Sequence, residues 1–513
     1  MLCPRLLISA AHKSSGKTTL AVGLAKALSE QGHAVQTFKK GPDYIDPMWL
    51  ARASGRPCFN LDPHLMHDAE IGALFARHAA GADISLVEGN KGLYDGLALD
   101  GSNSNAALAC RLDMPVLLVI DARGMTRGIA PLILGYQAFD RQVRIGGVIL
   151  NQLGGARHEA KLRAVIEHYT DVPVLGAVQH DSRLAMVERH LGLMPTAEVG
   201  NVDQRLRGMA AAVAAQVDLG RVRALAATAS AIVSAIAAAP PVSRVATARR
   251  LRIGIARDEA FGFYYPDDLD ALEAAGATLI PIDTLRDARL PALDGLFIGG
   301  GFPEALMAPL EANGALRAAI RAAVADGLPV YAECGGLMYL ARSITWNGRV
   351  AQMVGAIPGD VVMRERPVGR GYVRLAQTGD HPWPQSAAAG HECLGHEFHH
   401  SELVDADPGL RYAYAVQRGH GVDGRRDGVL VNNLLASYSH LRATGGNQWP
   451  QRFMNFVRSR CQPQRSPAPA NDGAKDAWQS ARRLAAHPGA CRAPIVNTKK
   501  GPQDVQRHKL RSE

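Results

Sequence analysis

The sequence predicts an α/β protein with two doubly wound domains, whose sheets are mostly parallel, followed by a disordered C-terminal tail. Short apolar runs recur along the chain, each followed by a glycine-rich or polar turn and a helical pattern. Apolar strands that alternate with helices are typical of parallel sheets covered on both faces. A chain of 513 residues has room for about three domains. We expect domains at 1–220 and 251–460, an Ala/Pro-rich linker at 221–250 and the tail at 461–513.

Each element follows from a local pattern. In the first domain, buried strands are expected at residues 6–10, 84–87, 116–120 and 147–150, with a helix over 19–31. In the second domain, strands are expected at 252–256, 278–282, 295–298 and 329–332. Ligands of such sheets bind beyond the carboxyl ends of the strands. The motifs that directly follow strands are therefore the candidates for function.

Composition excludes several classes of protein. Hydrophobic residues make up 47% of the chain, which is enough for packed cores. No apolar run reaches the roughly 18 residues of a spanning helix, and the N-terminus lacks the pattern of a secretory signal. The seven cysteines are scattered and do not form a disulfide framework. We expect a cytoplasmic protein that does not bind membranes.

The excess of basic residues lies mostly in the tail. The chain carries 57 Lys and Arg against 48 Asp and Glu, and residues 461–513 alone hold ten basic and four acidic side chains. This tail has few large apolar residues, so burial cannot offset the entropy of ordering it. Because the rest of the chain is nearly balanced in charge, nucleic acid is not an expected partner.

Residues 11–18, AHKSSGKT, follow the first expected strand and open a helix. They match the end of a P-loop, with Ala11 in place of the first glycine. Backbone N–H groups at a helix N-terminus, a lysine and a hydroxyl suit phosphates and Mg²⁺. The alternative is a polar capping turn that contains Gly-Lys-Thr by chance. The strand–turn–helix context favours a nucleotide site formed by Ser14, Ser15, Gly16, Lys17, Thr18 and Thr19.

Two acidic stretches, KKGPDYIDP at 39–47 and VEGNKGLYDG at 87–96, follow later elements. Carboxylates at strand ends that face a P-loop commonly hold Mg²⁺. Glu88 ends a strand as in a Walker-B arrangement, which favours metal or phosphate chemistry. Asp43, Asp46 and Asp95 are equally compatible with capping of Gly/Pro-rich turns. The expected metal-site residues are Thr18, Asp46 and Glu88.

A nucleophile elbow is indicated in the second domain by the segment PVYAECGGLMY, an apolar strand, one cysteine, two glycines and a helix. The helix N-terminus is expected to lower the pKa of Cys334 and to supply N–H donors for an oxyanion. A buried structural thiol is the alternative, and it is our interpretation of Cys110. Oxyanion donors are expected at Gly300, Gly301 and Gly335.

A cysteine nucleophile needs a base, and His440 follows an expected strand in the same domain. Histidines also cluster in GHEFHHS at 395–401. No Cys or carboxylate pair completes a zinc pattern there, which favours structural or substrate-facing roles for these histidines.

A P-loop domain joined to a Cys/His elbow domain is typical of an amidotransferase. Over residues 5–458 the chain resembles the cobyrinate a,c-diamide synthase family. The matching segments, in order, are GPDYIDP, GRPCFNLDP, the VEG…GLYDG frame, ERHLGL, IGIARDEAFGFYYPDDLDAL, GLFIGGGFPE, YAECGGLMYL, GHEFHHS and LLASYSHL. This family combines a dethiobiotin-synthetase-like ATP domain with a class I glutamine amidotransferase domain of the cobyric-acid-synthase type. The resemblance implies a P-loop NTPase-like fold followed by a flavodoxin-like one.

The resemblance also implies a reaction, in which ATP converts a peripheral acetate carboxylate of a corrinoid to an acyl phosphate and ammonia from glutamine then forms the amide. The a- and c-acetates of cobyrinate or hydrogenobyrinate would be amidated, in cobalamin biosynthesis. Cys334 would form a γ-glutamyl thioester, with His440 as its base. Arg442 stands where the usual acid of the triad is found, so a Cys–His dyad is implied. The implied cofactors are ATP and Mg²⁺.

The departures from the family concern the substrate. Asn90 and Lys91 replace the usual Val-Met, and no second His follows His440 closely. These features resemble a branch that amidates other tetrapyrroles such as siroheme, which is the alternative substrate. Lys91 would pair with a substrate carboxylate or be a solvated loop lysine. Expected substrate residues are Asp43, Tyr44, Lys91 and Asp95.

A second alternative is a non-catalytic P-loop protein that binds a tetrapyrrole or another protein. It would bind ATP but would not hydrolyse glutamine. The intact elbow and His440 argue against this alternative. The sequence allows a homodimer.

Overall fold

The computed structural model describes residues 3–186, 188–189, 192–231, 249–383 and 391–461. Residues 1–461 form one compact unit. The tail predicted at 461–513 lies outside the described residues except for Cys461, which ends the last helix. Most of the predicted linker, from 232 to 248, also lies outside them.

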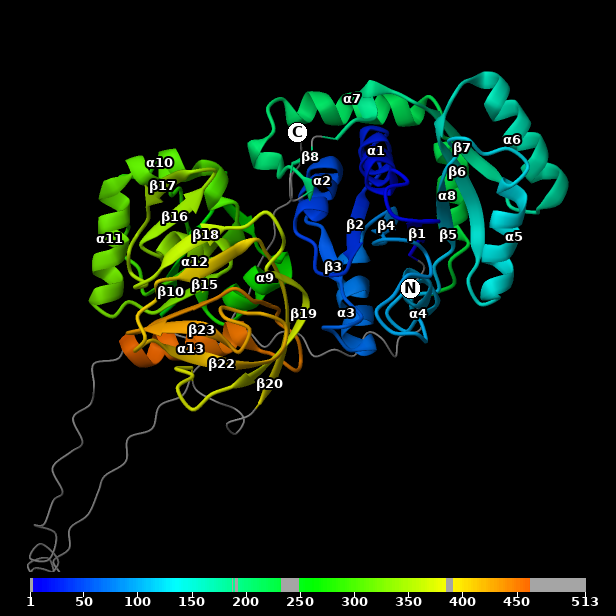
Figure 1. Ribbon diagram of the computed structural model, residues 1–513. Helices are drawn as coiled ribbons and strands as arrows, with labels where there is room; N and C mark the ends of the chain where they lie inside the picture. The colour runs from blue at the N-terminus through cyan, green and yellow to red at the C-terminus, as the bar shows by residue number, and fades with distance from the viewer. Residues whose placement is uncertain (1–2, 187, 190–191, 232–248, 384–390, 462–513) are drawn as a thin grey trace, which may run out of the picture. The chain divides into compact units, whose positions relative to one another are not determined.

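The first half of the chain is built on a seven-stranded sheet with the order β3-β2-β4-β1-β5-β6-β7 (Figure 1). All of its strand pairs are parallel. Its strands are β1 (Arg5–Ala10), β2 (Val35–Lys40), β3 (Phe59–Leu61), β4 (Ile84–Glu88), β5 (Val116–Asp121), β6 (Ile145–Leu153) and β7 (Val174–Gln179). The P-loop follows β1 at the middle of the sheet, where the order of the strands reverses.

Helices cover both faces of this sheet because successive strand residues point to opposite sides. In β1, Leu6 and Ile8 join one apolar cluster and Leu7 joins the other. The first cluster contains α1 (Lys17–Glu30), α2 (Ile45–Ser54), α7 (Val202–Ala214) and α8 (Leu219–Ala227). The second contains α3 (Asp68–Ala79), α4 (Asn105–Arg111), α5 (Ile129–Phe139) and α6 (Ala156–Tyr169).

Short elements connect β7 to α7. They are η1 (Ser182–Leu184), β8 (Glu188–Arg189), β9 (Gly192–Leu193) and η2 (Thr196–Glu198). The linker prediction of 221–250 begins too early, because residues 221–227 belong to α8. Leu219, Val222 and Ala226 of α8 are buried against the sheet, so apolar packing continues the domain beyond residue 220.

The second half contains a ten-stranded sheet with the order β12-β10-β13-β15-β24-β23-β22-β19-β20-β25. Its first five strands are parallel: β12 (Ala277–Ile282), β10 (Leu251–Ala256), β13 (Gly295–Ile298), β15 (Val330–Glu333) and β24 (Leu434–Ser437). The remaining strands are antiparallel: β23 (Arg426–Val431), β22 (Arg411–Arg418), β19 (Gly369–Gln377), β20 (Glu392–His399) and β25 (His440–Leu441). The expected parallel strands lie in the first part, whereas the sheet as a whole is mixed.

Helices again cover both faces of this sheet. One apolar cluster contains α10 (Met307–Ala312), α11 (Gly314–Ala325) and α12 (Gly335–Leu340), and the other contains α9 (Pro266–Ala274) and α13 (Trp449–Cys461). Small sheets pair β11 (Phe261–Phe263) with β14 (Gly300–Gly301) and join β17 (Arg349–Gln352), β16 (Ser343–Trp346), β18 (Asp360–Met363) and β21 (Ser401–Val404). A short helix, η4 (Pro303–Leu306), follows β14.

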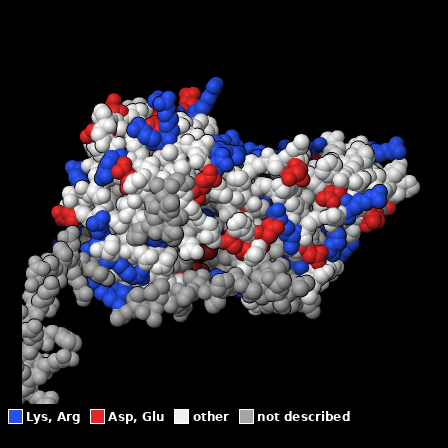
Figure 2. All heavy atoms as spheres, turned by 90° about the horizontal axis from the view of Figure 1, so that it is seen from below, with Lys and Arg blue, Asp and Glu red and all other residues white. Residues whose placement is uncertain are grey.

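The surface drawn in Figure 2 carries acidic and basic side chains interspersed with one another. Among the described helices, none combines the length and the apolar character that crossing a membrane requires. The six described cysteines are free thiols, and Cys110 is exposed rather than buried as expected.

Candidate active site

The loop after β1 has the backbone of a phosphate-binding turn. Ser14 and Gly16 both have left-handed backbones, with φ of 66° and 83°, and α1 begins at Lys17. Asn151 on β6 donates from Nδ2 to the carbonyl of Ser15 at 2.9 Å. The Ser15 hydroxyl donates to the carbonyl of His12 at 2.8 Å. These bonds hold the turn at the N-terminus of α1, with Thr18 and Thr19 in the first helical turn.

Opposite charges gather directly beyond this turn. Lys17 Nζ lies 3.0 Å from Glu88 Oε1, and Thr18 donates from its hydroxyl to the same oxygen at 2.5 Å. The Thr18 hydroxyl also lies 3.3 Å from Asp46 Oδ2. The structure thus brings together the three residues expected at a metal site.

Lys39 completes this cluster, although the stretch 39–47 predicted no role for it. Its ammonium group lies 2.5 Å from Asp46 and 3.2 Å from Glu88, with a side chain only 2% exposed. Burial alone would lower the pKa of Lys39, but Asp46, Glu88 and Asp43 raise it above its usual value. Burial raises the pKa of Asp46, Asp43 adds to this effect, and Lys39 opposes it.

The expected substrate residues of this half differ in their surroundings. Asp43 caps a turn, because its Oδ1 accepts from the N–H groups of Ile45 and Asp46. Asp95 accepts similarly from the N–H of Gly92 at 2.8 Å. Both contacts correspond to the turn-capping alternative, although Asp43 also lines a cavity. Lys91 is exposed, in a left-handed backbone conformation with φ of 45°.

Cys334 stands at a strained turn between β15 and α12. Its φ of 46° and ψ of −101° lie outside the ordinary regions for a residue with a side chain. The Cys334 N–H donates to the carbonyl of Ser437 on β24 at 2.7 Å, which ties the turn to the sheet. This is the geometry of a nucleophile elbow, as the segment PVYAECGGLMY predicts.

Two glycines allow the elbow to pack tightly against neighbouring backbone. A Cβ added to Gly336 would lie 2.3 Å from the carbonyl oxygen of Ile298. A Cβ on Gly335 would lie 2.9 Å from the backbone nitrogen of Gly301. Gly301 and Gly335, two of the three expected oxyanion residues, are therefore adjacent. The third, Gly300, lies against His440, since a Cβ there would be 2.6 Å from His440 Cε1.

The thiol is buried, and this reverses one sequence expectation. Burial raises the pKa of Cys334, and Glu304 nearby adds to this effect. The expected lowering by a helix N-terminus does not prevail, because α12 has only six residues and desolvation of the thiolate outweighs its dipole. A base is therefore needed to remove the thiol proton.

His440 lies in β25 with its Nδ1 nitrogen 3.3 Å from Oε2 of Glu333, the residue before the cysteine. Oε1 of this buried carboxylate accepts from the Tyr331 hydroxyl at 2.6 Å and from the Leu441 N–H at 2.9 Å. Arg442, which occupies the usual acid position, instead binds Asp267 at 2.9 Å and the carbonyl of Asn60 at 2.6 Å. Glu333 thus adds a carboxylate to the expected Cys–His dyad.

The histidines of GHEFHHS take separate positions. His396 stacks on His440 with ring centroids 4.9 Å apart, and burial lowers its pKa well below the usual value. His399 stacks on Tyr438 at 4.0 Å and lies 3.7 Å from Glu397. Among the described residues, no three His, Cys, Asp or Glu side chains are grouped as a metal site. These histidines are structural or face the cavity.

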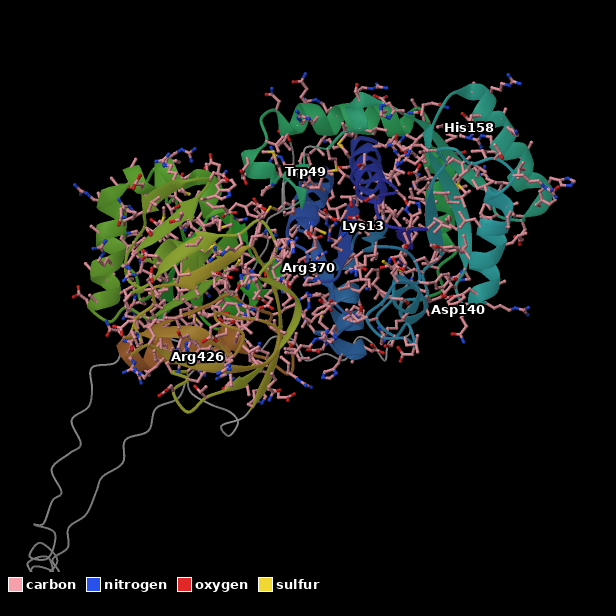
Figure 3. The ribbon with its side chains drawn as sticks, in the orientation of Figure 1. Lys13, Trp49, Asp140, His158, Arg370 and Arg426 are labelled. Carbon is pink, nitrogen blue, oxygen red and sulfur yellow. The ribbon has the colours of Figure 1, made fainter. Side chains whose placement is uncertain are left out.

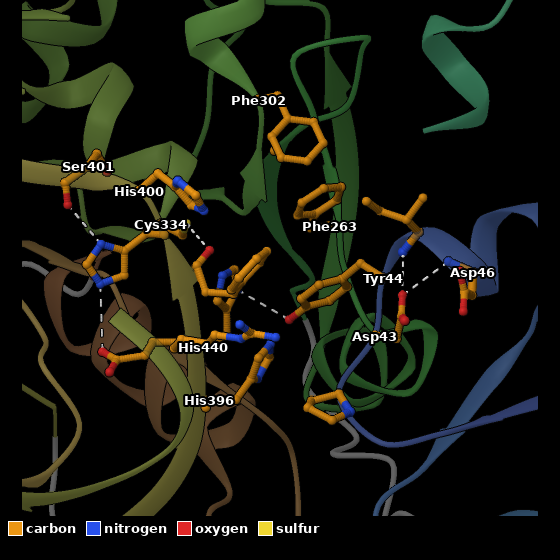
Figure 4. A pocket seen from close by; sticks show the side chains of 18 of the residues that line it. Asp43, Tyr44, Asp46, Phe263, Phe302, Cys334, His396, His400, Ser401 and His440 are labelled. Atoms are coloured by element: carbon orange, nitrogen blue, oxygen red, sulfur yellow. Dashed lines mark hydrogen bonds and ion pairs between the residues drawn. The ribbon is translucent and has the colours of Figure 1, made fainter. Parts of the chain in front are cut away.

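A single cavity of about 460 Å³ reaches both groups of residues. Cys334 and His440 line it together with Asp43, Asp46 and Asn90 from the first half of the chain. Figure 4 shows Tyr44 between them, with its hydroxyl directed at His440. Its ring stacks on Phe263 with centroids 5.2 Å apart. The structure therefore places Tyr44 beside the thiol site.

Figure 3 marks further positions around these sites, with Lys13 in the P-loop, Trp49 on α2 and Arg370 on β19. Arg370 lines the cavity, as does Lys40, whose Nζ donates to Asn90 Oδ1 at 3.1 Å. Burial lowers the pKa of Lys40 to about 8, although Asp62 opposes this.

No functional role was predicted for Lys39 or Glu333, although each is a charged residue in a buried strand. Lys39 is a charged residue in β2, all of whose residues are buried, and an unpaired charge is costly there. Glu333 ends a buried strand directly before Cys334. A carboxylate or ammonium in such a strand indicates a partner across the sheet.

Comparison with known proteins follows the same division of the chain. Residues 7–193 match the CobQ/CobB/MinD/ParA nucleotide binding domain, and residues 252–448 match the CobB/CobQ-like glutamine amidotransferase domain. Cobyrinate a,c-diamide synthase of Magnetococcus marinus is 44% identical over 89% of this chain and 98% of that protein. The protein of the same name from Methanosarcina acetivorans is 43% identical over 85% of this chain and 92% of its own length. The chain therefore belongs to the cobyrinate a,c-diamide synthase family, with a nucleotide-binding domain and a glutamine amidotransferase domain.

Proposed function

We propose that this protein is a ligase that uses ATP and glutamine to amidate the a- and c-acetate carboxylates of cobyrinate or hydrogenobyrinate. The names of its relatives support this substrate. The observation that carries the proposal is the cavity lined both by Cys334 and His440 and by residues beside the P-loop. The same cavity would place ammonia released at the thiol near residues of the phosphate site.

At the thiol site, His440 takes the proton of Cys334 while the sulfur attacks the side-chain amide carbon of glutamine. Glu333 accepts from Nδ1–H and leaves Nε2 as the base. The N–H groups around Gly300, Gly301 and Gly335 receive the negative oxygen of the tetrahedral intermediate. The protonated His440 then gives its proton to the leaving ammonia, and water hydrolyses the γ-glutamyl thioester to glutamate and free thiol.

At the phosphate site, the P-loop N–H groups of Ser14, Ser15 and Gly16 bind the phosphates of ATP. Lys17 and Lys39 hold the transferred phosphoryl group against a carboxylate of the substrate. These two lysines neutralise charge as the acyl phosphate forms and ADP leaves. Ammonia then attacks the acyl carbon, and phosphate leaves to give the amide.

Mg²⁺ fits the residues at this site. Oε2 of Glu88 is buried and has no hydrogen-bond partner among the described residues, which leaves it for a cation. Asp46 and the Thr18 hydroxyl lie beside it, and such oxygen ligands suit Mg²⁺. When bound, Mg²⁺ neutralises the phosphate charge. Because Asp46 is already held by Lys39, the lysine keeps the carboxylate turned toward the site.

The acidic substrate requires cationic groups at the cavity. Lys40 and Arg370 line it, and Lys91 lies close enough to Lys40 to lower its pKa. We assign these three side chains to the peripheral carboxylates of the tetrapyrrole. Asp43 and Asp95 shape the loops that present the phosphate site, and Tyr44 faces the glutaminase half.

Mass measurement after incubation with ATP, Mg²⁺ and glutamine tests the proposal, with cobyrinate, hydrogenobyrinate and siroheme supplied separately. Each amidation replaces one hydroxyl by an amino group, so we expect the mass of cobyrinate or hydrogenobyrinate to fall by two such replacements. The mass of siroheme should stay unchanged. Amidation of siroheme alone would replace the substrate assignment. If the protein bound ATP but hydrolysed no glutamine under any condition, the proposal that it is a glutamine-using ligase would be contradicted.

A further inference from the structure

Nδ1 of His440 has two partners at the same distance. The Tyr44 hydroxyl and Oε2 of Glu333 both lie 3.3 Å from it. Glu333 belongs to the amidotransferase half, whereas Tyr44 belongs to the nucleotide-binding half. The nitrogen that sets the tautomer of the glutaminase base is therefore contacted from both halves of the chain.

The Tyr44 hydroxyl can accept from Nδ1–H or donate to an unprotonated Nδ1, and only the donating arrangement favours a different form of the imidazole from the Glu333 contact. A carboxylate only accepts, so its bond to His440 needs a proton on Nδ1 and leaves Nε2 free as a base. A Tyr44 hydroxyl that donates to Nδ1 needs that nitrogen unprotonated, which places the proton on Nε2. In that second form, the neutral imidazole cannot accept the proton of Cys334. In this donating arrangement, the hydroxyl of Tyr44 competes with the catalytically competent state.

Tyr44 is carried by the turn that forms the phosphate site. Asp43 before it caps the turn, and Asp46 after it contacts both Thr18 of the P-loop and Lys39. Its ring is held by stacking on Phe263 and lies 4.6 Å from the ring of Tyr265. A ligand that engages Asp46 or Thr18 changes contacts within two residues of Tyr44.

We propose that the Tyr44 hydroxyl donates to Nδ1 of His440 in the free enzyme and so restrains the glutaminase base, and that occupation of the phosphate site withdraws this hydroxyl. The inference rests on the proposed function, because it concerns the timing of the same glutaminase. Tyr44 is a positioning residue that acts through His440. Glutamine is then hydrolysed mainly when an activated carboxylate is waiting for ammonia.

Tyr44→Phe removes the hydroxyl and keeps the ring that stacks on Phe263. With glutamine alone, we expect the kcat for glutamate release to rise about fivefold, the rate equivalent of one ordinary hydrogen bond. The KM for glutamine should stay within about twofold, because the hydroxyl acts on the base rather than on binding. The factor by which ATP, Mg²⁺ and cobyrinate increase the glutaminase rate should be correspondingly smaller in this variant.

Tyr372→Phe is the matched control. The Tyr372 hydroxyl also joins the two halves, through Asp62 at 3.0 Å, and no contact between it and His440 is found. We expect no rise in the glutaminase rate of this variant. An equal rise in both variants would attribute the effect to a loosened domain contact and would overturn the proposal.

Glu333→Gln supplies a second check. If Tyr44 competes with Glu333 for Nδ1, the gain from Tyr44→Phe should disappear in the Glu333→Gln background. An unchanged or lower glutaminase rate in Tyr44→Phe would overturn the restraint, while wild-type amidation from glutamine would leave the proposed function standing. A wild-type protein without glutaminase activity would instead overturn the proposed function.

Discussion

The phosphate site and the thiol site use buried charge differently. At the phosphate site, Lys17, Lys39, Asp46 and Glu88 form a network of ion pairs that a nucleotide would have to enter. At the thiol site, Cys334 is a neutral, buried group in a strained backbone, and one buried carboxylate orients its histidine. At the first site, a ligand can replace partners within the ion-pair network. At the second site, the backbone geometry positions a neutral thiol.

Because of this difference, substitutions at the two sites should have different effects. Removing one charge from the network leaves its partners unpaired in a buried environment, which costs stability as well as activity. Replacing a neutral thiol by a hydroxyl changes little in the fold. Variants of the thiol site should therefore separate chemistry from stability, whereas variants of the phosphate site should affect both.

The largest expected effect is that of Cys334→Ser. Loss of the nucleophile should lower glutamine-dependent amidation by about a thousandfold or more. Amidation with added ammonia should continue, because the phosphate site is untouched. Product mass with each nitrogen source measures both rates. Loss of the ammonia-dependent reaction in a variant with wild-type thermal stability would contradict the division between the two sites.

Lys39→Met tests the charge network. Asp46 and Glu88 would lose a buried cation, and we expect the free energy of unfolding to fall by about 3 kcal/mol. Urea unfolding measures this change, and ammonia-dependent amidation should fall with it. Lys26→Met is the control, since the pair of Lys26 with Glu30 on α1 is partly exposed and contributes about 0.5 kcal/mol or less. Equal losses in both variants would argue against a special role for burial.

Glu333→Gln tests the orientation of the base. The new amide can donate to Nδ1 of His440, which favours the tautomer with its proton on Nε2. We expect the kcat for glutamine hydrolysis to fall by about a hundredfold, with the ammonia-dependent rate unchanged. Initial rates with the two nitrogen sources decide the matter. A glutamine rate within twofold of wild type would mean that His440 needs no carboxylate partner.

The pH dependence of thiol alkylation gives the smallest expected effect. Because burial raises the pKa of Cys334, the thiol is protonated near neutral pH. Its reaction with iodoacetamide should accelerate as pH rises past the ordinary range of a cysteine. At neutral pH we expect Cys334 to react at least about tenfold more slowly than the exposed Cys110. Peptide mass mapping follows both residues, and equal rates would indicate a preformed thiolate–imidazolium pair.

Local motifs predicted much of this arrangement. The P-loop and the elbow are contiguous segments, and their strand–turn–helix backbones form where the residues indicate. The parallel strands of both sheets also follow from their apolar runs. The antiparallel half of the second sheet was not predicted, because its strands carry exposed residues on one face and lack continuous apolar runs.

The partners of the catalytic groups were missed because they depend on strand register. The pairing of β2 with β4 sets Lys39 opposite Glu88, and the pairing of β20 with β25 sets His396 opposite His440. Glu333 meets His440 only because β15 and β24 are neighbours. The spacing of residues along the chain does not predict these contacts, because they result from packing over the whole sheet.

Residue types and short-range backbone preferences were thus sufficient to predict the strand–turn–helix segments around Lys17 and Cys334. A glycine turn, the start of a helix and an apolar strand each depend on a few consecutive residues, so they can be recognised in the sequence. Tertiary packing decided the rest: the elevated pKa of Cys334, the carboxylate beside His440 and the approach of Tyr44 from the other half. Those features arise from desolvation and from contacts between residues hundreds of positions apart.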